Sequence, residues 1–169
     1  MGYARVCVGL LAVLLTACSA SVRQTPESTG KYALETVQRR DDQRFLNLCA
    51  TKDDVLAALD ASPEMPEDKK REWLKYLKET DWTALRESQL SNFHRVCDAA
   101  NWKQAVVEEY EYKVETTSGP PRCADICVWT MIDARRVGLR LDDPFLSPTG
   151  WCTMEPRPVR ACIGAEVVK

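Results

Sequence analysis

The sequence predicts an α+β domain in which an N-terminal helical half, of about four helices, precedes a small antiparallel sheet stapled by disulfides. Three observations support this fold class. Apolar residues recur at helical spacing from about residue 31 onward, and the period changes from 3.6 to 2 after Asn101. Helices followed by strands are typical of α+β domains. An even set of cysteines in the same region suits disulfide bonding.

The first two helices are predicted between Tyr32 and Ser62. The first is indicated by apolar residues that share one helical stripe, namely Leu34, Val37, Phe45 and Leu48. Thr51 followed by Asp54 matches a capping arrangement and begins the second helix. The apolar face of that helix holds Val55, Leu56 and Leu59, and Ser62-Pro63 ends it.

Two more helices are predicted between Pro66 and Asn101. Proline is tolerated in a first helical turn, and the acidic pair after Pro66 suits the positive end of the helix dipole. Asp81 is expected to be the N-cap of the fourth helix. The residues expected to be buried are Trp73, Leu74 and Leu77 in the third helix, and Trp82, Leu85, Phe93, Val96 and Cys97 in the fourth.

The rest of the chain is predicted as short strands. Tyr110, Tyr112 and Val114 alternate with charged residues, which predicts an antiparallel strand with one buried and one solvated face. Residues 118–121 predict a turn, and residues 142–150, with two prolines, predict a loop. Further strands are expected at residues 126–132, 136–141, 151–152 and 161–168.

The first 17 residues have the parts of a secretory signal. Arg5 supplies the positive charge, and an almost unbroken apolar run covers Val6–Leu15. As a helix this run would rise about 15 Å, half of a bilayer core, so it is too short to span a membrane. The string Leu-Thr-Ala-Cys at residues 15–18 resembles the lipobox of bacterial lipoproteins. The alternative is an ordinary signal peptide with a cysteine after its cleavage site.

The lipobox resemblance implies an address for the protein. The Cys18 thiol would receive a diacylglycerol and become the first mature residue, and fatty acyl chains such as palmitate would anchor it in a membrane. In enterobacterial lipoproteins the next residue decides sorting, and Ser19 implies the outer membrane, facing the periplasm, if the host is Gram-negative. The expected organisation is a signal at 1–17, a lipidated cysteine and flexible tether at 18–30, and a single domain at 31–169.

Cysteine usage agrees with export. Cys7 lies in the signal and Cys18 in the lipobox. The disulfide candidates are the remaining cysteines, Cys49, Cys97, Cys123, Cys127, Cys152 and Cys162. They predict three disulfides with the connectivity left open. Cys49 and Cys97 lie near the ends of two predicted helices and are expected to form one of them.

The spacing of Cys123 and Cys127 raises a copper alternative. The string Cys-x-Asp-x-Cys resembles the copper site of the thioredoxin-like chaperones that assemble cytochrome oxidase. That family has prolines around its cysteines and a histidine downstream, whereas the only histidine here, His94, lies upstream. On a strand, residues four apart are also about 13 Å apart, too far to share a metal ion or a disulfide. We therefore expect structural cysteines and no metal site.

Other candidate residues do not form a catalytic set. One histidine cannot build a multi-histidine metal site, and no nucleophile-elbow pattern surrounds His94. The glutamates that alternate along the predicted strand, Glu108, Glu109, Glu111 and Glu115, are expected to be solvated. The tryptophans are expected mostly in the core, with Trp73, Trp82, Trp102 and Trp129 placed more firmly than Trp151. No catalytic residue and no cofactor is predicted.

The charge of the chain bears on its partners. There are 23 Lys and Arg residues against 25 Asp and Glu residues, a net charge of −2, with both signs mixed along the chain. Binding to nucleic acid needs a positive stripe, so no nucleic-acid partner is expected. The sequence favours a non-enzymatic, lipid-anchored envelope protein that binds or supports another periplasmic or outer-membrane component. The alternative is a periplasmic inhibitor or immunity protein against an envelope-targeting toxin.

Overall fold

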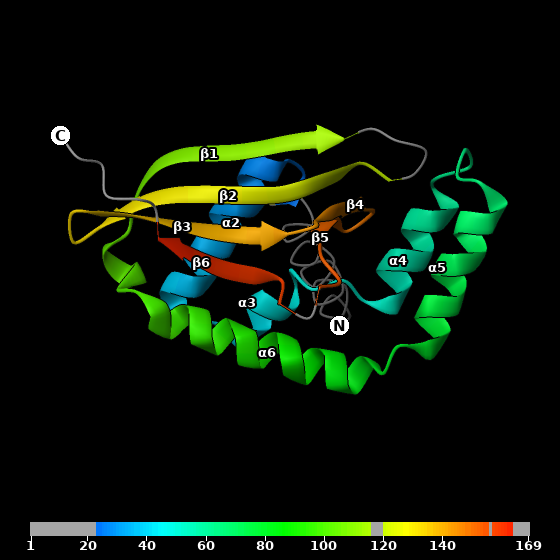
Figure 1. Cartoon of the computed structure of the whole chain (residues 1–169), viewed down its shortest axis with the longest axis horizontal. Helices are drawn as coiled ribbons and strands as arrows, with labels where there is room; N and C mark the ends of the chain where they lie inside the picture. Colours follow the sequence, from blue (N-terminus) through cyan, green and yellow to red (C-terminus); the bar gives the residue numbers. More distant parts are fainter. Residues whose placement is uncertain (1–22, 116–119, 156, 164–169) are drawn as a thin grey trace, which may run out of the picture.

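A computed structural model describes residues 23–115, 120–155 and 157–163, and Figure 1 shows the arrangement. The helices are α2 (Pro26–Arg39), α3 (Asp42–Leu46), α4 (Lys52–Asp60), α5 (Glu67–Glu79), α6 (Trp82–Ala99) and the 3-10 helix η2 (Trp102–Gln104). The strands are β1 (Val106–Glu115), β2 (Arg122–Ile132), β3 (Arg135–Asp142), β4 (Phe145–Ser147), β5 (Gly150–Cys152) and β6 (Val159–Ile163). The α+β class, with helices before an antiparallel sheet, is confirmed.

The first predicted helix is two helices. Helix α2 ends where Arg40 adopts a left-handed conformation with φ 54°, and Asp41 caps the start of α3. The predicted apolar stripe, Leu34, Val37, Phe45 and Leu48, is buried as expected. The rings of Phe45 and Phe93 stack with their centroids 4.4 Å apart, which joins α3 to α6.

The predicted tether is wrong from Arg23 onward. Thr25 and Ser28 form a capping box that begins α2 at Pro26. Thr29 and Gly30, in the second turn, are already buried. The segment has no apolar periodicity because its buried face is small and polar, and this is why the pattern indicated a tether. The remaining part of that prediction, residues 18–22, lies outside the described residues.

The other helix boundaries follow local capping chemistry. Thr51 and Asp54 form the predicted capping box of α4. Asp81 accepts hydrogen bonds from the backbone N–H groups of Thr83 and Ala84 and caps α6 as predicted. Pro66 is the N-cap residue of α5. Of the three residues of α5 expected to be buried, only Leu77 is, whereas Trp73 is partly buried and Leu74 is exposed.

The sheet is antiparallel, with the strand order β5-β4-β2-β3-β6 and with β1 paired to β2. Strand β4 continues β3, since the pairs Asp125–Asp142 and Arg122–Phe145 keep one register along β2. Part of the predicted loop at 142–150 is therefore strand. The predicted turn at 118–121 lies only partly within the described residues.

Helices cover one face of the sheet. Helix α2 crosses behind β1, β2 and β3, and α6 runs beside β6 (Figure 1). Gly30 approaches β2 so closely that a Cβ there would lie 2.8 Å from Cγ2 of Val128. Strand β1 is less covered than predicted, because Tyr112 and Val114 are each 41% exposed. Of the three residues expected on the buried face of this strand, Tyr110 alone is partly buried.

The predicted disulfides are absent from the described part of the chain, where all six candidate cysteines are free thiols. The expected bridge between Cys49 and Cys97 is wrong. Cys49 follows α3 and forms a β-bridge with Thr153, whereas the Cys97 thiol, near the end of α6, faces the carbonyl oxygen of Val37 at 3.9 Å. Within the described residues, no helix has the length and apolar character needed to cross a membrane.

Candidate functional site

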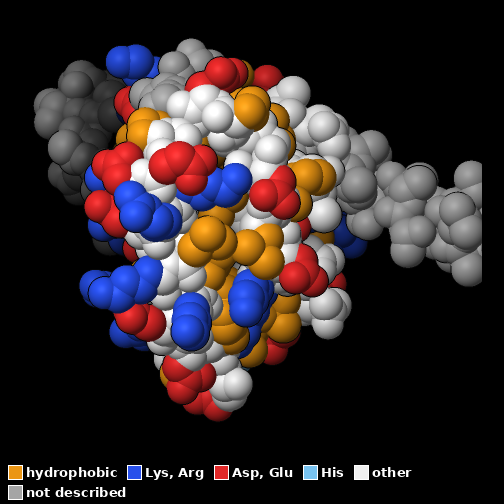
Figure 2. All heavy atoms as spheres, turned by 90° about the vertical axis from the view of Figure 1, so that its right-hand side faces the viewer, with side chains coloured by type: hydrophobic (Ala, Val, Ile, Leu, Met, Phe, Trp, Pro, Cys, Tyr) orange, Lys and Arg blue, Asp and Glu red, His pale blue; other side chains and the backbone are white. Residues whose placement is uncertain are grey.

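The candidate site is an apolar groove of about 600 Å³ at one end of the sheet. Helix α4 contacts β4 at this end, and α5 lies on the outer side of α4 (Figure 1). The groove lies between these helices, the beginning of β2, β4 and the chain that follows β5. Figure 2 shows this side of the molecule, where apolar side chains are exposed at the centre and charged side chains surround them. We call this feature the α4–α5 groove.

The floor of the α4–α5 groove is built from apolar side chains of three elements. Val55, Ala58 and Leu59 share one face of α4, because residues three and four apart lie on the same side of a helix. Phe145 of β4 and Met154 after β5 complete the floor, and all five belong to one core cluster. Each of these five residues is at most 7% exposed, so the groove meets the cluster over a small area.

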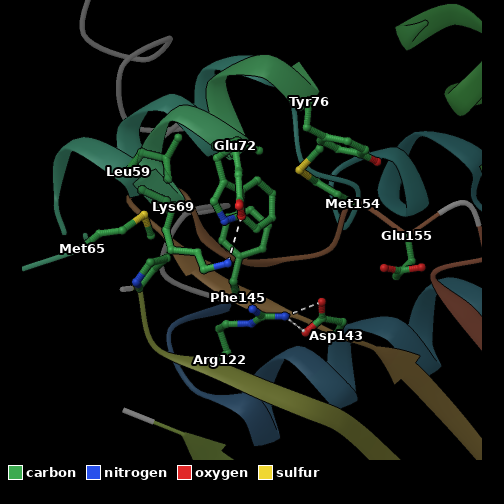
Figure 3. Close-up of a pocket in the computed structure, with 14 residues that line it drawn as sticks. Leu59, Met65, Lys69, Glu72, Tyr76, Arg122, Asp143, Phe145, Met154 and Glu155 are labelled. Atoms are coloured by element: carbon green, nitrogen blue, oxygen red, sulfur yellow. Dashed lines mark hydrogen bonds and ion pairs between the residues drawn. The ribbon is translucent and has the colours of Figure 1, made fainter. Parts of the chain in front are cut away.

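The walls of the groove come from α5 and the turn before it. Met65 and Leu59 lie at one end, and Tyr76 and Met154 at the other (Figure 3). Trp73 lines the space between them and its ring meets that of Tyr76 edge-on, with centroids 6.1 Å apart. Methionine side chains adapt to differently shaped occupants, and aromatic ones offer large rigid contact areas.

Ion pairs fix the charges at the rim. Arg122 donates two hydrogen bonds from one nitrogen to the Asp143 carboxylate, the longer at 2.6 Å. The hydrogen bond from Arg122 to Asp143, with the negative charge of that carboxylate, raises the pKa of Arg122 against the opposing effect of burial. Lys69 pairs with Glu72 at 3.0 Å, while the exposed Glu155 stands apart from both pairs (Figure 3).

The backbone places Asp143 over Arg122. Asp143 has φ 43°, in the left-handed region that aspartate tolerates better than most residues. Its N–H donates to the carbonyl oxygen of Ala124, while the N–H of Cys123 donates to the carbonyl oxygen of Pro144. The kink between β3 and β4 therefore directs a carboxylate to the mouth of the groove.

A second, more polar cavity of about 560 Å³ lies on the opposite side of α4. Its walls include Arg23, Asp54 and Thr149. Burial raises the pKa of Asp54, but the hydrogen bonds from Thr149 and Thr51 outweigh it, and the net pKa is below its usual value. This carboxylate is thus held ionised as part of the α4 cap.

The lining of the α4–α5 groove has the composition of a binding surface. Its lining contains no histidine, cysteine or serine. An apolar floor with a few fixed polar groups at the edge is typical of a binding site. No group of three histidine, cysteine or acidic side chains in the described structure is arranged to hold a metal ion.

The cysteine pair of the copper alternative is separated by the sheet. Both residues lie on β2, as the strand argument requires. Cys123 is fully buried in the core cluster that contains Ile126 and Val128. The Cys127 sulfur lies on the other face, 3.2 Å from where a Cβ of Gly138 would be. The two thiols therefore do not converge on one site.

The other sequence candidates have structural partners. His94 is exposed and its Nε2 lies 2.9 Å from a carboxylate oxygen of Asp42. Glu108 and Glu109 pair with Arg136, and Glu111 accepts a hydrogen bond from the indole N–H of Trp129 at 2.9 Å. Trp102 and Trp151 are buried, whereas Trp73, Trp82 and Trp129 are only partly buried. Cys18, the predicted lipidation site, lies outside the described residues.

The sequence reasoning missed the groove. Its lining comes from segments between residues 55 and 155, and no local motif marks them. One signal was present in the sequence, since the α5 segment combines aromatic residues with lysines. In the structure Tyr76 of this helix is 47% exposed. No protein-family model, no curated protein and no solved structure matches this chain.

Proposed function

We propose that this is a non-enzymatic, lipid-anchored protein of the bacterial cell envelope that binds a partner protein through the α4–α5 groove. The observation that carries the proposal is the apolar lining of the groove, in which the exposed Tyr76 and the partly exposed Met65 and Trp73 stand over a buried floor beneath a rim of paired charges. The lipobox resemblance at residues 15–18 supports the anchor, and Ser19 supports the outer membrane and its periplasmic side. Anchoring raises the effective concentration only for partners near the same membrane.

The chemistry of the groove favours apolar side chains of a protein as its occupant. Protein interfaces combine a buried apolar and aromatic centre with a polar rim. Here Trp73, Tyr76 and the two methionines supply the centre, and the pairs Lys69–Glu72 and Arg122–Asp143 supply a rim of both signs. A rim of both signs can pair with the charged residues of a partner protein that surround an apolar side chain inserted in the groove.

Site-specific photo-crosslinking tests this function in intact envelopes. A photoreactive phenylalanine analogue replaces Tyr76, which lines the groove, or Tyr112, which is similarly exposed on β1 and lies outside it. We expect one discrete protein adduct from position 76 and none from position 112. Met65→Glu, which places a charge in the groove, should abolish the adduct, while Leu74→Glu, on exposed α5 surface outside the lining, should leave it.

Two results would contradict binding through the groove. An adduct from position 76 that survives Met65→Glu would show that binding does not use the groove. Absence of any adduct specific to position 76 would reject the proposed function. Circular dichroism of both glutamate variants establishes that they remain folded.

A further inference from the structure

The chain is fixed to the domain at Arg23, close to the predicted anchor. The Arg23 side chain is 7% exposed and its guanidinium donates to the carbonyl oxygens of Asn47, Thr149 and Trp151. Its backbone is held as well, because a Cβ at Gly150 would lie 2.9 Å from the Arg23 carbonyl oxygen. The position of this residue relative to the fold is therefore set.

The length of chain between Cys18 and Arg23 limits how far the domain can stand from the membrane. Only five residue steps separate them. A fully extended chain of that length spans at most about 18 Å. If Cys18 carries the lipid, as the proposed function holds, the side of the domain that contains Arg23 lies within this distance of the membrane surface.

Helix α4 places the α4–α5 groove next to that side. Thr51, Asp54 and Ala57 of the α4 region line the cavity that contains Arg23, whereas Val55 and Leu59 line the groove. A helix with its side chains is about 10 Å wide. One helix therefore separates the groove from the point at which the chain leaves for the membrane.

We infer that the partner is a protein of the same membrane, and that it presents an apolar segment at the membrane surface to the α4–α5 groove. The inference rests on the proposed function and adds where the partner lies. A short link favours such a partner, because effective concentration falls steeply once a linker exceeds the span it must cover. A partner free in the periplasm would gain nothing from the short link.

Lengthening the link tests the inference. A flexible Gly/Ser insert of about 30 residues between Ser21 and Val22 should lower the position-76 adduct by about tenfold at limiting expression, since effective concentration falls with roughly the −3/2 power of linker length. The matched control appends the same insert after Lys169 and should leave the adduct unchanged. The protein identified in the adduct should itself remain with the membrane when envelopes that have not been crosslinked are washed with high salt.

Three outcomes would overturn the inference. These are an adduct whose yield is independent of link length, an adduct with a protein that high-salt washing removes from envelopes that have not been crosslinked, and an adduct with phospholipid alone. The first two differ from failure of the proposed function, because in that case the chain without an insert gives no groove-dependent protein adduct. An adduct with phospholipid alone would overturn both the inference and the proposed function. Globomycin-sensitive processing, with mass spectrometry of the mature N-terminus, checks the lipid on Cys18 separately.

Discussion

Gly30 shows how one residue controls the packing of α2 on the sheet. The second turn of α2 lies so close to β2 that only glycine leaves room for Val128, Ile126 and the Tyr110 ring. Alanine is about 1 kcal/mol more favourable than glycine within a helix. Here its methyl group would lie 2.8 Å from the Val128 side chain, which is closer than real Cβ contacts.

We therefore expect Gly30→Ala to destabilise the protein, by about 1–3 kcal/mol, because overpacking outweighs the gain in helix propensity. Urea denaturation measures the change. Val128→Ala should recover part of the loss when combined with Gly30→Ala, although alone it destabilises by leaving a cavity. If the loss of stability in the double variant equals the sum of the two single losses, the methyl group added at position 30 does not clash with Val128.

The thiols also differ at the residue scale. Burial raises the pKa of Cys49, Cys152 and Cys127 to about 12 each, and each of these side chains is at most 5% exposed. Cys162, on β6, is half-buried. Since the thiolate is the reactive form, we expect iodoacetamide at pH 8 to modify Cys162 first in the native protein.

Peptide mass mapping after short alkylation checks this order. Unfolding in urea should make all six cysteines react alike. Alkylation of native Cys49 as fast as Cys162 would contradict the burial of Cys49, and a mass two units lower per cysteine pair without reductant would show disulfides in place of thiols.

At the scale of an element, one face of α6 ties together two connections of the chain. Arg86 donates to the carbonyl oxygens of Ala50 and Cys49 after α3 and to the side-chain oxygen of Gln89. Gln89 is fully buried and donates to the carbonyl oxygen of Glu155 at 3.1 Å. Buried polar groups of this kind are costly when one partner is removed.

Gln89→Ala is therefore expected to lower the free energy of unfolding by about 1–3 kcal/mol, because the Glu155 carbonyl oxygen loses its partner and a cavity forms. Glu87→Ala, at an exposed position of the same helix, should change it by less than about 0.5 kcal/mol. Thermal denaturation of the two variants makes the comparison. Similar stability of both would show that the Gln89 contact contributes little.

The elements that the sequence predicted are those defined by neighbouring residues. The Thr51–Asp54 capping box and the Asp81 cap are local, so they are visible in the chain. The three residues of β4 lie between Pro144 and Pro148 and become a strand only by continuing the register of β3. Leu74 fits the helical pattern of α5, yet no other described element buries it.

At the scale of the whole molecule, the groove could not be predicted because its lining converges only after folding. Helix α4, β4 and the chain after β5 supply the floor and α5 supplies the walls, and none of these segments carries a local motif that marks the groove. The cysteine set shows the same limit. Parity suggested which cysteines could pair, but their positions depend on the sheet, which separates Cys123 from Cys127 and places Cys49 beside Thr153.

The buried thiols make stability depend on alkaline pH. A cysteine thiol exposed to water has a pKa of 9.0, and in the folded protein burial raises the pKa of Cys49 and Cys152 to about 12. Because the pKa of these thiols is higher in the folded protein than in the unfolded chain, their contribution to the free energy of unfolding is complete below pH 9. That contribution is lost as pH rises towards 12. Each thiol contributes a slope of at most about 1.4 kcal/mol per pH unit in that window.

Urea denaturation in reductant between pH 8 and 11 measures this loss. The variant Cys49→Ala/Cys152→Ala should start from lower stability and lose less of it as pH rises, because tyrosine and lysine titration is common to both proteins. Parallel pH profiles would contradict the assignment of the slope to these thiols.

Burial predicts that stability is uneven across the molecule and is lower in α5, which lines the groove, than in α6. Leu77 is the one buried residue of α5, whereas α6 buries six residues of its face. Helices held by few apolar contacts open locally at a smaller free-energy cost than the core. We expect backbone amides of α5 to exchange with deuterium well before those of α6, so that the wall of the groove can adjust to an occupant.

Hydrogen exchange with peptide-level mass spectrometry tests this expectation. Leu77→Ala should speed exchange in α5 and leave α2 unchanged if α5 opens as a local unit, because α2 is held by the sheet. Uniform acceleration of both helices would instead show one cooperative unit. The bound partner should slow exchange in α5 more than in α6. The reason is that α5 opens more readily in the free protein, so binding reduces its local opening more.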